Sequence, residues 1–234
     1  LGMIKFMWSF WPEVIMMSTF GIPKLILLVE FAGDSEKDID DKARALLPDL
    51  KKYPFRTRVT TSQAESEKYW DIRRESFALL RKHIKDKHTA PFIDDVVVRP
   101  EFLPEFLPKL YSMLDQYPIV YTIAGHAGNG NFHIIPLMDF SDPKTAPIII
   151  ELSRKVFDLV FEYKGSTTGE HNDGIIRAPF LSQMYGEKIY KLFKETKKIF
   201  DPQDILNPGK KIGATIDYLN THIVKESHSL SHKV

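Results

Sequence analysis

Two histidines flank a short glycine-rich segment near the middle of the chain. His126 and His133 enclose the six residues AGNGNF, and the residues on either side, 119–125 and 132–138, have the composition of β-strands. The glycines favour a tight turn, so the strands form a hairpin that brings both imidazole rings near one point. Imidazole nitrogens are common ligands of zinc, iron and manganese. The segment therefore predicts a metal site; the alternative is that both rings only hydrogen-bond to nearby carbonyl groups.

A second polar loop follows at residues 165–174, with the sequence GSTTGEHNDG. Glu170 offers a carboxylate that could complete a two-histidine metal set. His171 could act as a general base, because an ordinary histidine titrates near working pH. Alternatively, the loop is solvated and Glu170 pairs with a surface lysine or arginine. Two such loops in one domain favour a shared site.

Arg73 and Arg74 are adjacent on a helix that is predicted to begin at Ser62. A guanidinium can hold a substrate carboxylate through two parallel hydrogen bonds. The alternative is an exposed helix face on which an arginine pairs with an acidic neighbour such as Glu75.

Other kinds of chemistry fit the sequence less well. The run GHAGNGN at residues 125–131 is only loosely like a phosphate-binding loop, and a strand rather than a helix follows it. No GxSxG elbow for Ser-His-Asp catalysis occurs. The chain has no cysteine, which excludes disulfides, thiolate metal sites and cysteine nucleophiles. Any metal must be bound by His, Asp, Glu, Asn or backbone oxygen.

The elements that must position these residues alternate along the chain. Hydrophobic patterning predicts strands at residues 24–32, 55–61, 92–98, 119–125 and 132–138. Helices are predicted at residues 34–52, 62–86, 101–116, 147–163 and 185–200. This order, with its one tight hairpin, predicts an α+β domain with helices packed on one face of a mostly antiparallel sheet.

Composition limits the function classes. The 234 residues include 32 Lys plus Arg and 31 Asp plus Glu, for a net charge of +1. This balance argues against a dedicated nucleic-acid binder, which would show a basic excess. Apolar residues make up 43% of the chain, which is enough to build a core and excludes global disorder.

The first 22 residues are unusually apolar and aromatic. Lys5, Pro12 and Glu13 interrupt them, so no stretch reaches the roughly 20 apolar residues of a membrane span. We expect this segment to pack on a preceding domain or on this one, with a peripheral membrane contact as the alternative. At the other end, residues 215–234 are expected to form a loose tail.

Three motifs together resemble the C-terminal domain of FAD-linked oxidases of the vanillyl-alcohol-oxidase type. This family includes D-lactate dehydrogenases, the glycolate oxidase D subunit and D-2-hydroxyglutarate dehydrogenases. Its pattern is roughly GHxGDGNxH, then GxxxGEHGxG, then FDPxxxLNPGK. The matching segments are GHAGNGNFH at 125–133, GSTTGEHNDG at 165–174 and FDPQDILNPGK at 200–210. The resemblance covers the chain from about residue 20 onwards.

The resemblance implies a domain organisation. It implies a ferredoxin-like substrate domain at residues 23–214, preceded by an exit segment, 1–22, from a separate N-terminal FAD-binding domain, and followed by the tail. FAD would be bound mainly by that other domain, so we expect this chain alone to be inactive.

The resemblance also implies roles for individual residues. His126, His133 and Glu170 would bind a divalent metal such as zinc, manganese or iron. His171 would accept the substrate's hydroxyl proton. The family's Trp-x-x-Arg pattern matches Trp70 to Arg73, so Arg73 rather than Arg74 would bind the substrate carboxylate. The remaining implied contacts are to substrate, by Asn131, and toward the flavin, by Asn207, Gly209 and Lys210.

The implied activity is oxidation of a D-2-hydroxy acid, similar to D-lactate or glycolate, to the 2-oxo acid by hydride transfer to flavin. The alternative is a non-catalytic metal- or ligand-binding module without flavin. We expect a cytoplasmic protein, at the inner membrane surface if a quinone or another electron carrier is the acceptor. Two positions depart from the family pattern: Asn129 replaces an Asp that could tune a metal-binding histidine, and Asn172 replaces a Gly.

Overall fold

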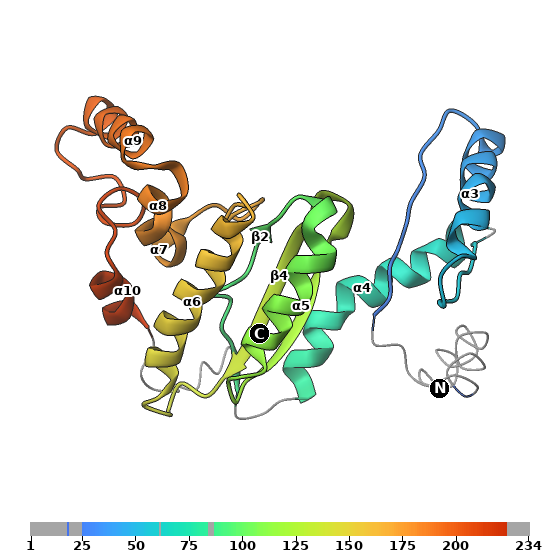
Figure 1. Ribbon diagram of the computed structural model, residues 1–234, viewed down its shortest axis with the longest axis horizontal. Coiled ribbons are helices and arrows are strands. Elements are labelled where there is room, and N and C mark those ends of the chain that lie inside the picture. The colour runs from blue at the N-terminus through green and yellow to red at the C-terminus, as the bar shows by residue number, and fades with distance from the viewer. Residues whose placement is uncertain (1–17, 19–24, 61, 84–86, 224–234) are drawn as a thin grey trace. The chain divides into compact units, whose positions relative to one another are not determined.

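The computed structural model describes residues 18, 25–60, 62–83 and 87–223. The chain divides into two compact units, Leu1–Leu79 and Leu80–Val234, and each is described by itself (Figure 1). The predicted exit segment, apart from Ser18, and the end of the predicted tail lie outside the described residues.

The regular structure described in the first unit is helical. Helix α3 (Glu36–Leu50) begins after Ser35, whose hydroxyl accepts a hydrogen bond from the backbone N–H of Asp38. Helix α4 (Gln63–His83) follows and continues past the boundary between the units. Both helices confirm the sequence-based expectation.

The two strands expected in the first unit are wrong over the residues that are described. Residues 25–32 and 55–60 have no strand, and Leu25, Leu27 and Val29 are largely exposed. A strand is stable only where a neighbouring strand binds its backbone N–H and C=O groups. Among the described residues of this unit there is no such neighbour, so apolar composition alone does not produce a strand here.

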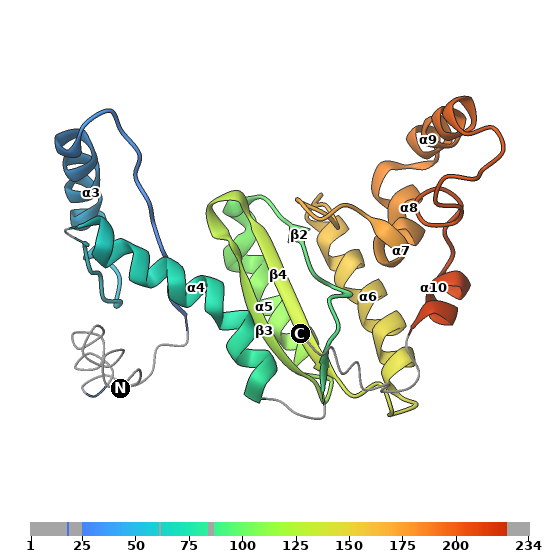
Figure 2. The same ribbon diagram turned by 180° about the vertical axis from the view of Figure 1, so that it is seen from behind.

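The second unit contains a four-stranded antiparallel sheet centred on β4 (Asn131–Met138). Strand β3 (Val120–His126) pairs along almost the whole of β4. Two short strands, β1 (His88–Thr89) and β2 (Val96–Val97), pair with the opposite ends of β4 (Figure 2). The hairpin strands are confirmed, whereas the strand expected at 92–98 is reduced to β2 and β1 is an addition.

Two helices cover one face of this sheet and form the core with it. Helix α5 (Leu103–Leu114) follows a 3-10 turn at Pro100–Phe102, and helix α6 (Thr145–Glu162) follows β4 (Figure 1). The buried core side chains come from α5 (Phe106, Leu110, Leu114), α6 (Leu152, Val156, Val160) and β4 (Phe132, Ile134, Met138). The α+β class with helices on one face of an antiparallel sheet is therefore confirmed.

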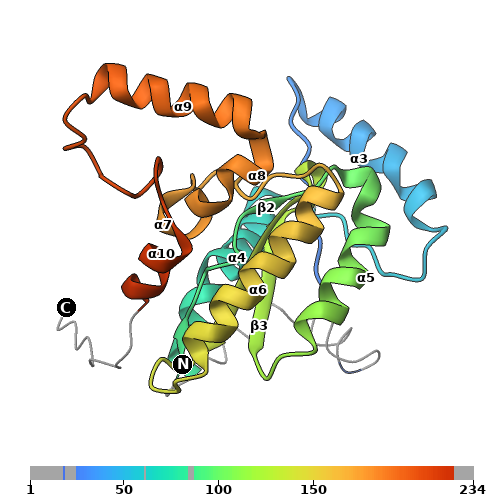
Figure 3. The ribbon, with the colours of Figure 1, turned by 60° about the vertical axis from the view of Figure 1, so that its left-hand side comes forward.

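The C-terminal third is helical. Short turns at α7 (Gly174–Arg177), η3 (Ala178–Phe180) and α8 (Leu181–Tyr185) lead into the longer α9 (Glu187–Phe200), as Figure 3 shows. Helix α10 (Ile216–His222) follows, so part of the expected tail is ordered; Thr215 caps it by accepting from the N–H of Tyr218. No helix within the described ranges has both the length and the apolar composition needed to cross a membrane.

Candidate functional site

The hairpin places both of its histidines on one face of the sheet. His126 lies opposite Asn131, and Ala124 lies opposite His133. Side chains alternate along each strand, so His126, Asn131 and His133 share one face, while Phe132 points into the core under the helices. The ring centroids of His126 and His133 are 5.6 Å apart. The expected convergence of the two rings is therefore present.

The turn between these strands requires glycine at its end. The 3-10 turn Ala127–Asn129 closes at Gly130, which has a φ of 67°. A Cβ atom on Gly130 would lie 1.7 Å from the carbonyl oxygen of Val98. Any other residue would therefore displace the hairpin from the segment that follows β2.

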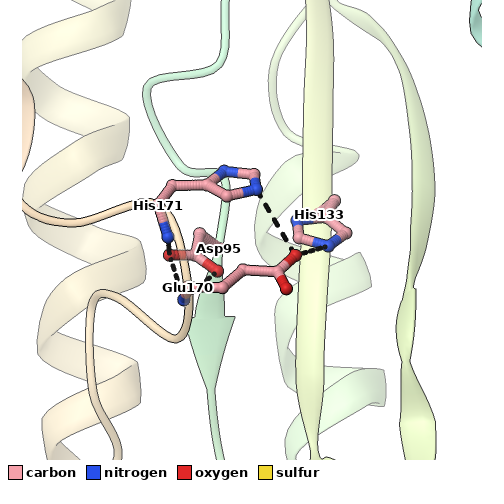
Figure 4. A group of neighbouring side chains, drawn as sticks. All are labelled: Asp95, His133, Glu170 and His171. Atoms are coloured by element: carbon pink, nitrogen blue, oxygen red, sulfur yellow. Dashed lines mark hydrogen bonds and ion pairs between the residues drawn. The ribbon is translucent and has the colours of Figure 1, made fainter.

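The Glu170 carboxylate lies at the centre of three imidazole rings. Its Oε1 atom is 3.0 Å from Nε2 of His133, 3.4 Å from Nε2 of His171 and 3.5 Å from Nε2 of His126. Figure 4 shows Glu170 reaching from its loop toward His133 on the central strand. Within the described part of the chain, these histidines are the ion-pair partners of Glu170, so the two polar loops do share one site.

The Asp95 carboxylate holds the second loop in place. It accepts hydrogen bonds from the backbone N–H groups of Glu170 at 3.1 Å and His171 at 2.8 Å (Figure 4), and from that of Gly169 at 2.8 Å. The Thr168 hydroxyl and the Asn131 amide each add a bond of 2.9 Å. Burial alone would raise the pKa of Asp95, but these donors together lower it well below its usual range. Asp95 is therefore an ionised anchor for the loop.

The neighbouring carboxylate, Asp94, contacts the histidines instead. Its Oδ1 is 3.0 Å from Nδ1 of His133, and its Oδ2 is 3.0 Å from Nδ1 of His171. Asp95 has a φ of 68°, in the left-handed region, and this turn of the backbone accompanies the divergence of the two carboxylates.

Sequence reasoning missed this acidic pair because residues 92–98 were interpreted only as a strand. The signal was present: two adjacent acidic residues inside the apolar run FIDDVVV must be paired if they are buried.

Arg177 is a buried cation behind the acidic pair. Its Nε and Nη2 atoms donate to the backbone oxygen of Asp94 at 3.2 and 2.8 Å, and Nη1 donates to the backbone oxygen of Asn172 at 2.7 Å. Burial lowers its pKa, while the charges of Asp95, Asp94 and Asp173 act in the opposite direction. Arg177 links the strand segment to the loop that carries Glu170, a role that the sequence did not reveal.

The donor atoms fit a divalent metal. Metal–ligand bonds of about 2.1 Å place neighbouring donor atoms about 3.0–3.4 Å apart, which is close to the observed separations around Glu170. Asp95, His133, Glu170 and His171 also offer ligand atoms within 4.8 Å of one another. The Asp95 oxygens are already occupied by loop N–H groups, so Asp95 is a poor ligand, whereas His133 and Glu170 remain available. His126 is not a member of that group of four, although its Nε2 lies 3.5 Å from Glu170 Oε1, so its part in a metal site stays a prediction.

Charge also favours a cation. Asp94, Asp95 and Glu170 carry three negative charges when ionised, and Arg177 supplies one positive charge. The metal-free site would therefore repel an anionic ligand, whereas a bound dication would offset the excess.

The three asparagines of the two polar loops have different environments. Asn131 is buried and donates to Asp95, and its Oδ1 has no hydrogen-bond partner among the described residues. Asn172 has a φ of 66°, so it keeps the left-handed conformation that the family's glycine would provide. Asn129 is exposed, and the carboxylate that contacts His133 is Asp94 instead.

The predicted substrate-binding arginine lies outside this cluster in the sequence. Arg73 is on α4, with its guanidinium carbon 5.7 Å from the Trp70 ring centroid, and its neighbour Arg74 pairs with Asp71. Arg73 belongs to the first unit, and its substrate role stays a prediction.

The third motif forms a tight turn. Asp201 accepts from the N–H groups of Ile205 at 3.0 Å and Leu206 at 2.8 Å, and the paired Lys197 ammonium lowers its pKa. Asn207 follows with a φ of 50°, and Lys210 is exposed. The flavin-facing role of Asn207, Gly209 and Lys210 likewise stays a prediction.

Comparison with known proteins places these features in a family. Residues 23–211 match the family model described as FAD linked oxidases, C-terminal domain. D-2-hydroxyglutarate dehydrogenase of Pseudomonas putida is 31% identical over 189 residues, which are 79% of this chain and 19% of that protein. Glycolate oxidase subunit GlcD of Escherichia coli is 29% identical over 80% of this chain and 37% of its own length. The cytochrome-type mitochondrial D-lactate dehydrogenase of Arabidopsis thaliana is 32% identical over 61% of this chain and 25% of its own length. The chain thus spans about a fifth to two fifths of the length of these relatives.

Proposed function

This chain belongs to the family of FAD linked oxidase C-terminal domains, and from that premise we propose that it is the substrate domain of an FAD-dependent oxidoreductase. The proposed reaction oxidises a D-2-hydroxy acid, similar to D-lactate or glycolate, to the 2-oxo acid. The observation that carries the proposal is the approach of three imidazole Nε2 atoms to within 3.5 Å of Glu170 Oε1. The names of the relatives, which are hydroxy acid dehydrogenases and an oxidase subunit, support the same substrate class.

The proposed reaction removes two hydrogens from the substrate, one from the α-carbon and one from the hydroxyl group on it. The hydroxyl oxygen loses a proton, the α-carbon loses a hydride, and the C–O bond becomes a carbonyl. FAD, bound mainly by another domain, would supply the acceptor for that hydride. His126, His133 and Glu170 would hold a zinc, manganese or iron dication, which would supply Lewis-acid polarisation of the substrate's hydroxyl group.

His171 is the proposed proton acceptor. Its side chain is 46% exposed, whereas that of His133 is 11% exposed, so an incoming substrate reaches His171 more readily. Its Nε2 lies beside the same Glu170 oxygen as the proposed metal ligands, so a hydroxyl group held there would be within reach of this nitrogen.

The substrate carboxylate needs a separate partner, and we assign it to Arg73. Asn131, whose Oδ1 has no partner among the described residues, is assigned a polar contact in which this oxygen accepts from the substrate hydroxyl. A guanidinium can bind a carboxylate through two parallel hydrogen bonds and so fix which α-hydrogen faces the flavin. Asn207, Gly209 and Lys210 are assigned to the side that faces the flavin-binding domain. On this proposal, hydride transfer requires both the substrate site of this chain and the flavin held by the other domain.

Ligand binding by the chain itself gives the first test. Calorimetry of the zinc-loaded chain with D-lactate, D-2-hydroxyglutarate and glycolate is expected to show binding of at least one acid. For each of the two chiral acids, the D enantiomer should bind more tightly than the L enantiomer. Binding should disappear after removal of zinc and in the His126→Ala, His133→Ala double variant. Zinc binding without affinity for any hydroxy acid would instead favour a non-catalytic metal-binding module.

Turnover gives the second test. With its flavin-binding domain present, the enzyme is expected to lose about 100- to 10,000-fold in kcat after His171→Ala, since general-base catalysis contributes on that order. Full turnover in this variant would exclude His171 as the proton acceptor. The chain alone with added FAD should not reduce an artificial electron-accepting dye at a measurable rate.

A further inference from the structure

We propose that Asp94 is a positioning residue that sets the tautomer of two histidines at once, so that a metal ligand, His133, and the proton acceptor, His171, both present an unprotonated Nε2 to one point. The roles of these two histidines rest on the function proposed above. For His171 the tautomer follows from contacts of the chain alone, because Asp94 is 3.0 Å from Nδ1 and Glu170 is 3.4 Å from Nε2. For His133 the two carboxylates are equally close, at 3.0 Å, so its tautomer also depends on a metal that takes the place of a proton on Nε2.

The hydrogen bonds at Asp94 dictate where the ring protons lie. Each carboxylate oxygen is 3.0 Å from the Nδ1 of a different ring. An ionised carboxylate has acceptor sites only, so both Nδ1 atoms must carry a proton. In a neutral imidazole the other nitrogen is then bare. Both Nε2 atoms lie beside Glu170 Oε1, at 3.0 Å for His133 and 3.4 Å for His171, so a metal held by Glu170 and His133 would meet an unprotonated Nε2 on each ring.

Both proposed roles require this tautomer. A metal-bound histidine coordinates through an unprotonated nitrogen, and its other N–H is normally held by a carboxylate or carbonyl group. A general base likewise needs a free lone pair directed at the proton that it accepts. The unusual feature is that one carboxylate serves both rings, which are stacked with centroids 4.9 Å apart and an interplanar angle of 11°.

Asp94 is held firmly enough to act in this way. Its side chain is 8% exposed. Two hydrogen bonds from the Arg177 guanidinium fix its backbone oxygen. The next residue, Asp95, ties the loop of Glu170 and His171 to the same strand segment. The carboxylate and both rings are thus positioned before any ligand arrives.

An isosteric change separates this role from simple packing. In Asp94→Asn the side chain keeps its shape but offers one oxygen acceptor and one NH₂ donor. Only one ring can then keep its proton on Nδ1, because the other Nδ1 faces a donor. In the zinc-loaded chain, coordination holds His133 in the Nδ1–H form. His171 must then move its proton to Nε2 and lose the lone pair that accepts the substrate proton.

The test is imidazole ¹⁵N NMR of the labelled, zinc-loaded chain at a pH at which the rings are neutral. In the wild type, His133 is expected to be bound to zinc through Nε2, and both rings should carry hydrogen on Nδ1. In Asp94→Asn, His171 should shift to the Nε2–H tautomer. Asp173→Asn is the matched control, because Asp173 is a neighbouring shielded acid whose ion-pair partner is Lys211 rather than a histidine. Its His171 tautomer should be unchanged.

Two results would overturn the inference. One is a wild-type His171 protonated on Nε2, which needs no variant and so decides the matter even if Asp94→Asn does not fold. The other is an Asp94→Asn chain in which neither ring moves its proton. If zinc does not bind, the tautomer of His171 in the metal-free wild type tests the inference. It should be Nδ1–H, because Nδ1 is 3.0 Å from Asp94 whereas Nε2 is 3.4 Å from Glu170.

Function provides a second readout. Asp94→Asn should weaken zinc binding by about 10- to 100-fold, as changes to an outer partner of a metal-bound histidine typically do. Asp173→Asn should leave it within about threefold. In the enzyme with its flavin-binding domain, kcat should fall more than KM rises. Correct tautomers without hydroxy acid turnover would refute the proposed function and leave the role of Asp94 intact.

Discussion

His133 and His171 lie with their rings parallel, 4.9 Å between centroids, and each Nδ1 bonds to a different oxygen of Asp94. One ring comes from the central strand of the sheet and the other from a loop after helix α6. Their alignment therefore depends on what joins that strand to that loop. The joining groups are Asp94, Asp95 and Arg177, and the predictions below test the metal site and then this framework.

Removing the two hairpin histidines should abolish metal binding. In His126→Ala, His133→Ala the proposed donor set loses both of its imidazole nitrogens and keeps only Glu170. We expect zinc affinity to fall by more than the about 10- to 100-fold seen for outer hydrogen-bond partners. Elemental mass spectrometry should find near-stoichiometric metal in the wild type and almost none in the variant.

A His88→Ala, His222→Ala double variant provides the control for that experiment. Both residues are exposed and lie on β1 and α10, outside the cluster. Its metal content should match the wild type. Equal loss of metal in both double variants would show that zinc binds elsewhere.

Stability should depend on pH through Asp95. Folding lowers the pKa of this carboxyl below the about 3.9 of an unfolded aspartate. Its contribution to stability is therefore complete above that pH and is lost as pH falls through the lowered value. Urea denaturation followed by circular dichroism should show the free energy of unfolding decreasing from about pH 4 downwards.

The Asp95→Asn variant should lack the acid-sensitive contribution to the free energy of unfolding. Its amide would direct an NH₂ group at backbone N–H donors, so it should be less stable by about 3 kcal/mol at neutral pH. Its stability should then vary less than that of the wild type below pH 4. Asp217→Asn, on the exposed surface of α10, should keep the wild-type profile. If Asp95→Asn lost stability below about pH 4 as steeply as the wild type does, other carboxyl groups would be the cause of that loss.

Arg177 should be required for stability rather than for a particular chemical step. Arg177→Met removes three hydrogen bonds to backbone oxygens and leaves Asp94 and Asp95 without a buried counter-charge. Breaking a buried ion pair costs about 3–5 kcal/mol, and we expect a loss of that size in urea denaturation. Arg154→Met, on the exposed side of α6, should change stability by less than about 0.5 kcal/mol. A loss below about 1 kcal/mol in Arg177→Met would contradict the proposed linkage.

Gly169 should be intolerant of even one added methyl group. A Cβ atom there would lie 2.5 Å from Nδ2 of Asn131 and 2.8 Å from Cγ2 of Val97. Gly169→Ala should therefore push the loop away from Asp95, destabilise the chain by about 1–3 kcal/mol and weaken zinc binding. Gly128→Ala is the matched control, because a Cβ atom at Gly128 meets nothing within 4 Å. Similar effects of the two substitutions would show that the close contacts at Gly169 are not the cause.

The hairpin and the helices of the second unit were predictable from local pattern. Strand-like segments on either side of AGNGN indicated β3 and β4, and the tight turn with its two glycines indicated that they pair as a hairpin. Amphipathic spacing located α5, α6 and α9 to within a few residues. The same rules failed at residues 25–32 and 55–60, because an apolar or alternating run becomes a strand only beside another strand.

The sequence by itself determined which residue types are available for chemistry: two histidines on a hairpin, the Glu170–His171 pair on a polar loop, and no cysteine. It did not determine how these groups face one another. That depends on Asp94, Asp95 and Arg177, which are remote in sequence from the hairpin and which only the folded chain brings beneath it. A charged group buried during folding must find partners from distant segments, and no local period or motif encodes which partners those are.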